Sequence, residues 1–121
     1  SDVTIIANGL MVAEAIEAGK ELQAAGIDAE IINMATIKPL DAQLVVASAR
    51  KTGKVITVEE HNIIGGLGEA VCAALSTECP VPVKRIGIND EFGHSGPAKD
   101  LLKQFGLSAE NIVKVTKEFV K

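Results

Sequence analysis

The chain has 121 residues, of which 47% are hydrophobic, and this combination predicts a single domain over residues 1–121 with one core. Its formal net charge of −4 and the lack of a basic run argue against a nucleic-acid surface. Neither an apolar run of membrane-spanning length nor a basic-apolar leader occurs, so we expect no membrane contact and a cytoplasmic location.

The core must be built from aliphatic side chains, because the chain has no Trp or Tyr and only three Phe. Such a composition favours buried parallel strands packed under Ala-rich helices. Cys72 and Cys79 are too far apart for a Cys-x-x-Cys pair, and no cluster of histidines accompanies them. We therefore expect reduced thiols and no metal site.

The first third of the chain is typical of a strand-helix-strand unit. Val3–Ala7 is a β-rich run that ends at Asn8-Gly9, and Ala29–Met34 is a second apolar strand. Gly26 stands where a left-handed helix cap belongs. Between the two strands, apolar residues recur at helical spacing: Met11, Ala15, Ala18, Leu22 and Ala25.

The next segment repeats this alternation. Asp41 can cap a helix that ends with a basic pair and Gly53, and Val55–Val58 follows as the third strand. A third helix opens at Gly65-Gly66-Leu67-Gly68 and stops near Pro80.

The remaining chain supplies the fourth strand, Val83–Ile88, and two closing helices, one from Ser95 to Gly106 and one from Ser108 to Phe119. Strands separated by helical crossovers imply right-handed connections. The predicted fold class is therefore α/β, a three-layer α/β/α sandwich with a mostly parallel sheet.

Glu59-Glu60-His61 is the first candidate site, because it lies at the C-terminal end of the third strand. Open α/β sheets place their ligand-contacting loops at this edge. A carboxylate beside an imidazole could act in substrate binding or proton transfer. The alternative is an interfacial loop in which one glutamate holds His61, and the residues alone leave both interpretations open.

The second candidate is the glycine turn at Gly65, Gly66 and Gly68. Glycines before a helix can let backbone N–H groups approach a phosphate. However, the dinucleotide fingerprint fails, because Val71 stands where its third glycine belongs, and nearby glutamates would oppose a pyrophosphate. The turn is better explained by close helix-strand packing. Composition and spacing thus indicate an α/β domain without a self-contained active site.

Three sequence blocks carry a resemblance to a known family. The block from Thr57 to Val71 closely resembles the transketolase C-terminal domain, whose signature is an apolar strand, acidic residues, His and a Gly-Gly-x-Gly-Glu-Ala-Val turn. Ile37–Asp41 is similar to its mid-domain turn, and the blocks from Ser95 to Leu107 are similar to its closing segment. The spacing resembles the bacterial and archaeal branch in which transketolase is split into two subunits.

The resemblance implies a part of a thiamine diphosphate-dependent enzyme that transfers a two-carbon ketol unit between sugar phosphates. In that family the cofactor is held through Mg²⁺ by a Gly-Asp-Gly element of the N-terminal domain, and the activating glutamate lies in the middle domain. This chain has no Gly-Asp-Gly, so the resemblance implies that it binds no cofactor and is inactive alone. The expected partners are the middle and N-terminal domains or subunit, within a homodimer of the parent.

The resemblance also assigns the candidate residues to a turn that faces the middle domain: Glu59, Glu60, His61, Gly65, Gly66 and Gly68. The family's sheet has an additional first, antiparallel strand that precedes Val3, so we expect this piece of a longer chain to lack it. Four parallel strands in the order 2-1-3-4 are predicted, with one edge left bare or paired with a neighbouring molecule.

Three alternatives remain open at this point. The same domain occurs in deoxyxylulose-phosphate synthase and in the beta subunits of oxoacid dehydrogenases, and the Asp90–His94 stretch is somewhat like the synthase. A free-standing regulatory module that binds a ligand near His61 and Gly65 is a further hypothesis.

Overall fold

The structure is a computed structural model, which describes residues 2–8, 11–34, 42–62, 67–88 and 109–120. Strands and helices alternate along the described chain, as predicted. In chain order they are β1 (Val3–Ala7), α1 (Met11–Ala24), β2 (Ala29–Asn33), α2 (Ala42–Thr52), β3 (Val55–Asn62), α3 (Leu67–Glu78), β4 (Val83–Ile88) and α5 (Ala109–Phe119).

The described strands form one parallel sheet in the order β2-β1-β3-β4, which confirms the predicted order. The chain moves outward from β1 to β2, returns to pair β3 with β1, and ends at β4. The strand order therefore reverses between β1 and β3, and the carboxyl ends of these two strands form the edge where open sheets usually place a site.

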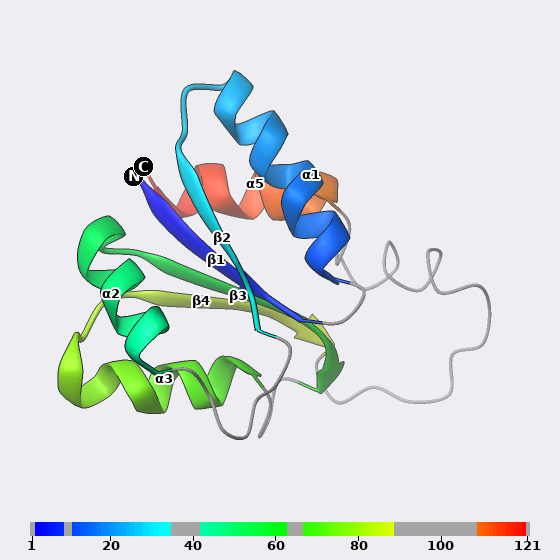
Figure 1. Cartoon of the computed structure of the whole chain (residues 1–121). Coiled ribbons are helices and arrows are strands. Elements are labelled where there is room, and N and C mark those ends of the chain that lie inside the picture. Colours follow the sequence, from blue (N-terminus) through cyan, green and yellow to red (C-terminus); the bar gives the residue numbers. More distant parts are fainter. Residues whose placement is uncertain (1, 9–10, 35–41, 63–66, 89–108, 121) are drawn as a thin grey trace.

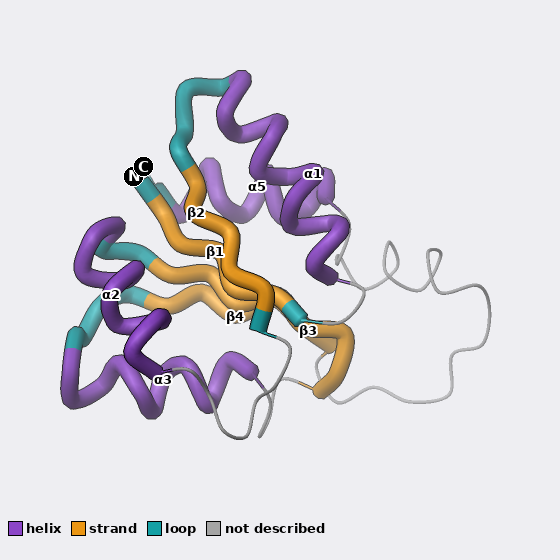
Figure 2. Tube along the Cα trace, in the orientation of Figure 1, coloured by secondary structure: helices purple, strands orange, loops and turns teal. Residues whose placement is uncertain are grey.

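Helices cover both faces of this sheet (Figure 1), with α1 and α5 on one face and α2 and α3 on the other. In Figure 2 the strands form the middle layer between these helix pairs. The predicted three-layer sandwich is thus confirmed.

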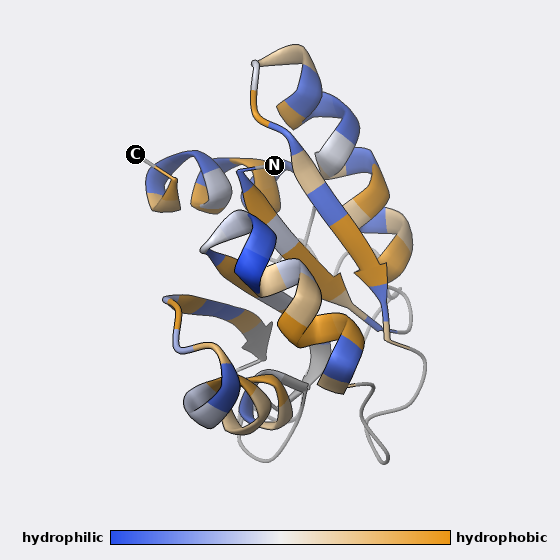
Figure 3. Cartoon of the chain, turned by 60° about the vertical axis from the view of Figure 1, so that its left-hand side comes forward, coloured by the Kyte–Doolittle hydropathy of each residue, from blue (hydrophilic) through white to orange (hydrophobic). Residues whose placement is uncertain are grey.

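The central strand β1 is buried on both of its faces. Val3, Ile5 and Ala7 pack into the cluster under α1 and α5, whereas Ile6 packs under α2 and α3. Figure 3 shows hydrophobic colour along the strands, with hydrophilic residues on the helices. This two-sided burial explains why apolar residues occupy both faces of β1, with Thr4 as its one polar residue.

Two helix ends follow the predicted glycine stops. Gly26 and Gly53 adopt positive φ angles of 83° and 76°, which side chains other than glycine rarely tolerate. The prediction for the third strand was too short, because β3 continues four residues beyond Val58 to Asn62. The predicted helix from Ser95 lies outside the described residues.

Candidate functional site

The first candidate site, Glu59-Glu60-His61, lies within β3 itself and not in a loop that follows it. Glu59, Glu60 and His61 are in the last four residues of the strand, at the carboxyl edge where they were expected. Gly65 and Gly66 lie outside the described residues, and Gly68 is the second residue of α3. The structure therefore brings Glu59 and Gly68 together but leaves the other candidates untested.

Glu59 caps the helix that follows it. Its side chain is 1% exposed, and its Oε2 accepts a hydrogen bond from the backbone N–H of Gly68 at 2.8 Å. The first N–H groups of a helix have no acceptor within the helix, and their partial positive charge favours a carboxylate. The strand thus supplies the cap of α3 from nine residues upstream.

Gly68 lets α3 approach the sheet closely. A Cβ atom at this position would lie 2.8 Å from Cγ of Arg85, closer still to its Cδ, and 3.1 Å from Oγ1 of Thr57. Real Cβ atoms are not found at the shorter of these distances, so only glycine fits without a shift of Arg85. This geometry supports the packing interpretation of Gly68. The interpretation as a phosphate-binding turn is disfavoured, because the backbone N–H of Gly68 already donates its hydrogen bond to the Glu59 carboxylate.

Two buried polar atoms near this edge were not anticipated from the sequence. Oγ1 of Thr57 and Oδ1 of Asn8 have no hydrogen-bond partner among the residues that the structure describes, and Thr57 is fully buried. Asn8 directly follows β1, and Thr57 lies on the neighbouring β3. The sequence signal for Asn8 was the Asn8-Gly9 strand end, whereas Thr57 stood out only as the first residue of the family block, because a threonine in a strand is ordinary.

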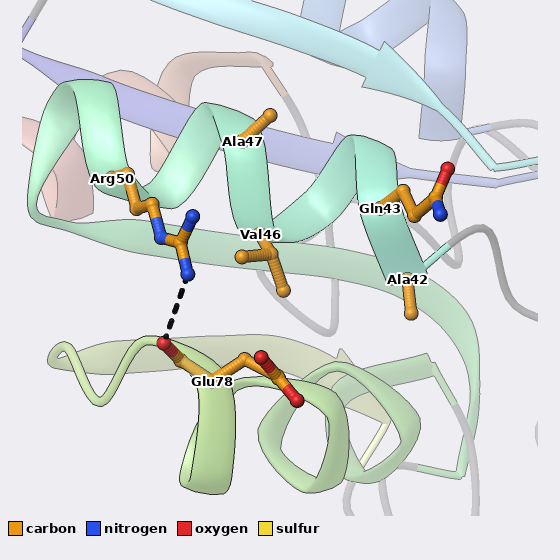
Figure 4. Close-up of a pocket in the computed structure, with 6 residues that line it drawn as sticks. All are labelled: Ala42, Gln43, Val46, Ala47, Arg50 and Glu78. Carbon is orange, nitrogen blue, oxygen red and sulfur yellow. Dashed lines mark hydrogen bonds between the residues drawn. The ribbon is translucent and has the colours of Figure 1, made fainter.

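A separate hollow of about 470 Å³ lies between α2 and α3 (Figure 4). Nη2 of Arg50 reaches across it and donates to the Glu78 carbonyl oxygen at 3.5 Å. Its lining consists of Ala42, Gln43, Val46, Ala47, Arg50 and Glu78. None of the sequence candidates is among the described residues that line this hollow, and the charged residues of that described lining are one arginine and one glutamate.

Cys72 and Cys79 are free thiols, and both are half-buried. Within the described ranges, no group of three or more His, Cys, Asp or Glu side chains could hold a metal ion. In that same part of the chain, every helix is too short or too polar to cross a membrane.

Comparison with known proteins decides the family. The family model described as "Transketolase, C-terminal domain" matches residues 1–112. The chain belongs to the transketolase C-terminal domain family. This transketolase C-terminal domain has the fold and the Glu59–Gly68 contact described above, and the resemblance seen at residues 57–71 is thereby confirmed.

Individual relatives place this domain within longer proteins. It is 49% identical over 117 residues to a 6-deoxy-6-sulfo-D-fructose transketolase subunit of Clostridium sp. (strain MSTE9), covering 97% of this chain and 36% of that subunit. It is 44% identical over 119 residues to a 1-deoxy-D-xylulose-5-phosphate synthase of Heliobacterium modesticaldum, covering 98% of this chain and 18% of the synthase.

A solved structure agrees with the sequence relatives. A split-gene transketolase, described as an inactive beta4 tetramer, superimposes with a TM-score of 0.89 at 50% identity. The match covers 97% of this chain and 37% of that one. The transketolase C-terminal domain therefore spans little more than a third of the split-type relatives that it matches.

Proposed function

We propose that this domain is the accessory, C-terminal part of a thiamine diphosphate-dependent transketolase that transfers a two-carbon ketol unit between sugar phosphates. The observation that carries the proposal is the 49% identity to a transketolase subunit over 97% of the chain. On its own the domain is inactive, because the family's catalytic elements belong to other domains. The complete enzyme works in the cytoplasm.

The parent enzyme, in this proposal, holds thiamine diphosphate and Mg²⁺ outside the domain. The described residues provide no cluster of ligands that would suit the ion. The buried acid of the candidate site, Glu59, is engaged by the Gly68 amide. In this proposal Glu59 therefore organises the end of β3. The carbanion chemistry belongs to the cofactor.

The partners we propose are the middle and N-terminal parts of transketolase, as domains or as a separate subunit, assembled into a homodimer. The docking residues are Glu60 and His61 at the end of β3, together with the glycine turn at Gly65, Gly66 and Gly68. This assignment is supported by the position of β3, which continues beyond the last residue paired with β1. We place the docking of the second domain at this strand end.

The test compares the isolated domain with the complete parent enzyme. Ketol transfer from a ketose phosphate to an aldose phosphate should occur only with the complete enzyme, and titration calorimetry should detect thiamine diphosphate binding only there. Ketol transfer or cofactor binding by residues 1–121 alone would contradict the proposal.

A second candidate function is supported by the 44% identity to a 1-deoxy-D-xylulose-5-phosphate synthase. The parent would then form deoxyxylulose phosphate, with this domain in the same accessory position. Assaying the complete enzyme for both products separates the two candidates, because ketol transfer between sugar phosphates and deoxyxylulose phosphate formation yield different sugars.

A further inference from the structure

The end of β3 projects from the sheet. Its pairing with β1 ends where Ala7 lies beside Val58. Its pairing with β4 continues, after an irregularity, to Asn62 beside Ile88. Glu59, Glu60 and His61 fill the irregular stretch between these two β3–β4 pairs, beyond the last residue of β3 that pairs with β1, so that β4 alone borders this part of β3 within the described sheet. A two-stranded ribbon is only marginally stable by itself, so its direction depends on what braces it.

The brace is the amino end of α3, joined to β3 and β4 through three side chains. The Glu59 carboxylate accepts the Gly68 N–H at 2.8 Å, with Glu59 itself 1% exposed. The Arg85 stem and the Thr57 hydroxyl lie against the Gly68 backbone, where a larger residue would require the Arg85 side chain to shift. Among these contacts, the Glu59 bond is the one made by the first residue of the projecting segment.

We propose that Glu59 is a positioning residue, whose bond to α3 sets the direction in which the projecting end of β3 meets the rest of the enzyme. The proposal rests on the proposed function, in which Glu60 and His61 dock on the other transketolase parts. Glu59 itself is buried and does not form the docking surface. It acts through the residues that follow it.

The chemistry of the bond explains why glutamate suits this position. Aspartate is shorter by one methylene, so its carboxylate would reach Gly68 only if α3 moved toward β3. Arg85 and Thr57 already stand at the limit of that approach. Glutamine keeps the length, and its Oε1 could still accept the Gly68 N–H, but it has no charge to oppose the positive helix end, so the bond should be weaker. Both changes should redirect the ribbon.

The experiment uses the complete parent enzyme with Glu59→Asp and Glu59→Gln. The control is Ser48→Ala, which removes a buried hydroxyl bonded to Thr4 at the opposite end of the sheet. Tm and the protein concentration at half-assembly, from sedimentation, are measured for each variant. Both Glu59 variants should raise the half-assembly concentration about ten-fold or more, which corresponds to a loss of at least 1.4 kcal/mol of assembly free energy. Ser48→Ala should lower Tm with little change in assembly.

If the Glu59 variants and Ser48→Ala show the same ratio of assembly loss to Tm loss, Glu59 is only a stabilising residue and the inference is wrong. Glu60→Lys and His61→Ala then test the proposed docking surface separately from the positioning role of Glu59. If these two variants weaken assembly while the Glu59 variants do not, the positioning role of Glu59 is wrong and the proposed docking surface is supported. If neither they nor the Glu59 variants affect assembly, the proposed docking surface itself is wrong.

Discussion

On the face covered by α2 and α3, the two ends of the sheet differ in whether their buried hydroxyl groups are hydrogen-bonded. At the amino end, Oγ1 of Thr4 shares hydrogen bonds with the hydroxyls of Ser48 at 2.7 Å and Thr52 at 2.8 Å. The Thr52 hydroxyl also lies 3.0 Å from the Lys54 carbonyl oxygen, to which it donates. Toward the carboxyl end, the Thr57 hydroxyl is equally buried but has no partner in the described part of the chain.

The difference indicates that the two ends of the sheet have different roles, one in stability and the other in function. The amino end joins β1 to the last turn of α2 through bonds between groups that are all satisfied, so it contributes to stability. The carboxyl end combines an unpartnered hydroxyl, a helix packed on a glycine and the Glu59 cap. Departures from ideal packing are expected where a fold serves function, and the predictions below test this contrast.

The largest effect should come from Gly68→Val. Its Cβ would overlap Cγ of Arg85 and press on Thr57, and overpacking of this kind costs about 2–3 kcal/mol of unfolding free energy. Urea denaturation of the domain measures the loss.

The control for this overlap is Gly68→Ala, measured with and without Arg85→Ala. Because the overlap is with the Arg85 side chain, the alanine variant should be destabilised only while Arg85 is present. If the losses of unfolding free energy are additive in the double variant, the overlap with the Arg85 side chain is not the cause of the destabilisation by Gly68→Ala.

At the amino end, Thr4→Val should destabilise the domain by about 1.5 kcal/mol, because it removes a hydroxyl that bonds to both Ser48 and Thr52. The same urea titration applies. An unchanged midpoint would mean that the hydroxyl cluster contributes nothing measurable, and the contrast between the two ends would disappear.

Thr57→Val makes the same chemical change at the carboxyl end and should have the opposite sign. Replacing a buried hydroxyl that lacks a partner with a methyl group should raise the unfolding free energy by about 1 kcal/mol. A loss as large as that of Thr4→Val would show instead that Thr57 is hydrogen-bonded in solution.

Much of the fold could be predicted from the sequence, because its strands are apolar runs with clear stops. β1 and β4 have the predicted bounds, and the glycine stops at Gly26 and Gly53 are confirmed by their φ angles. Strand β3 was predicted to end at Val58, because four polar residues follow. Glu59, the first of these residues, is buried and bonded to α3, and sequence spacing does not show such a tertiary contact.

The site could be predicted only in part. The packing interpretation of Gly68 rested on its place before a helix and is supported by the close approach of Arg85. The partner of Glu59 was not foreseen, since His61 is its nearer neighbour along the chain. Whether Glu60 and His61 face the other transketolase parts stays a prediction, as does the bare sheet edge.

The smallest effect concerns Glu30 of β2, at the margin of the amino-end cluster. Its carboxylate forms an ion pair with Lys51 and bonds to Ser48, and these contacts lower the pKa of Glu30 below the usual value for a glutamate. A lowered pKa stabilises the folded state at pH values above the ordinary glutamate range, and this contribution is lost as the pH falls through the folded-state pKa. Because Lys51 is 59% exposed and Glu30 28%, the pair contributes only about 0.3–0.5 kcal/mol.

Glu30→Gln should therefore lower Tm slightly at pH 7, and the difference from the unmodified domain should vanish once the pH falls below the lowered folded-state pKa of Glu30, where the carboxylate is protonated in both states. Glu17→Gln, at an exposed position of α1, is the matched control and should leave Tm unchanged across this range. The effect of Glu30→Gln should also shrink when Ser48→Ala is present, because Ser48 bonds to both Glu30 and Thr4. Full additivity of the two changes would place Glu30 outside the amino-end cluster and confine that cluster to its hydroxyl groups.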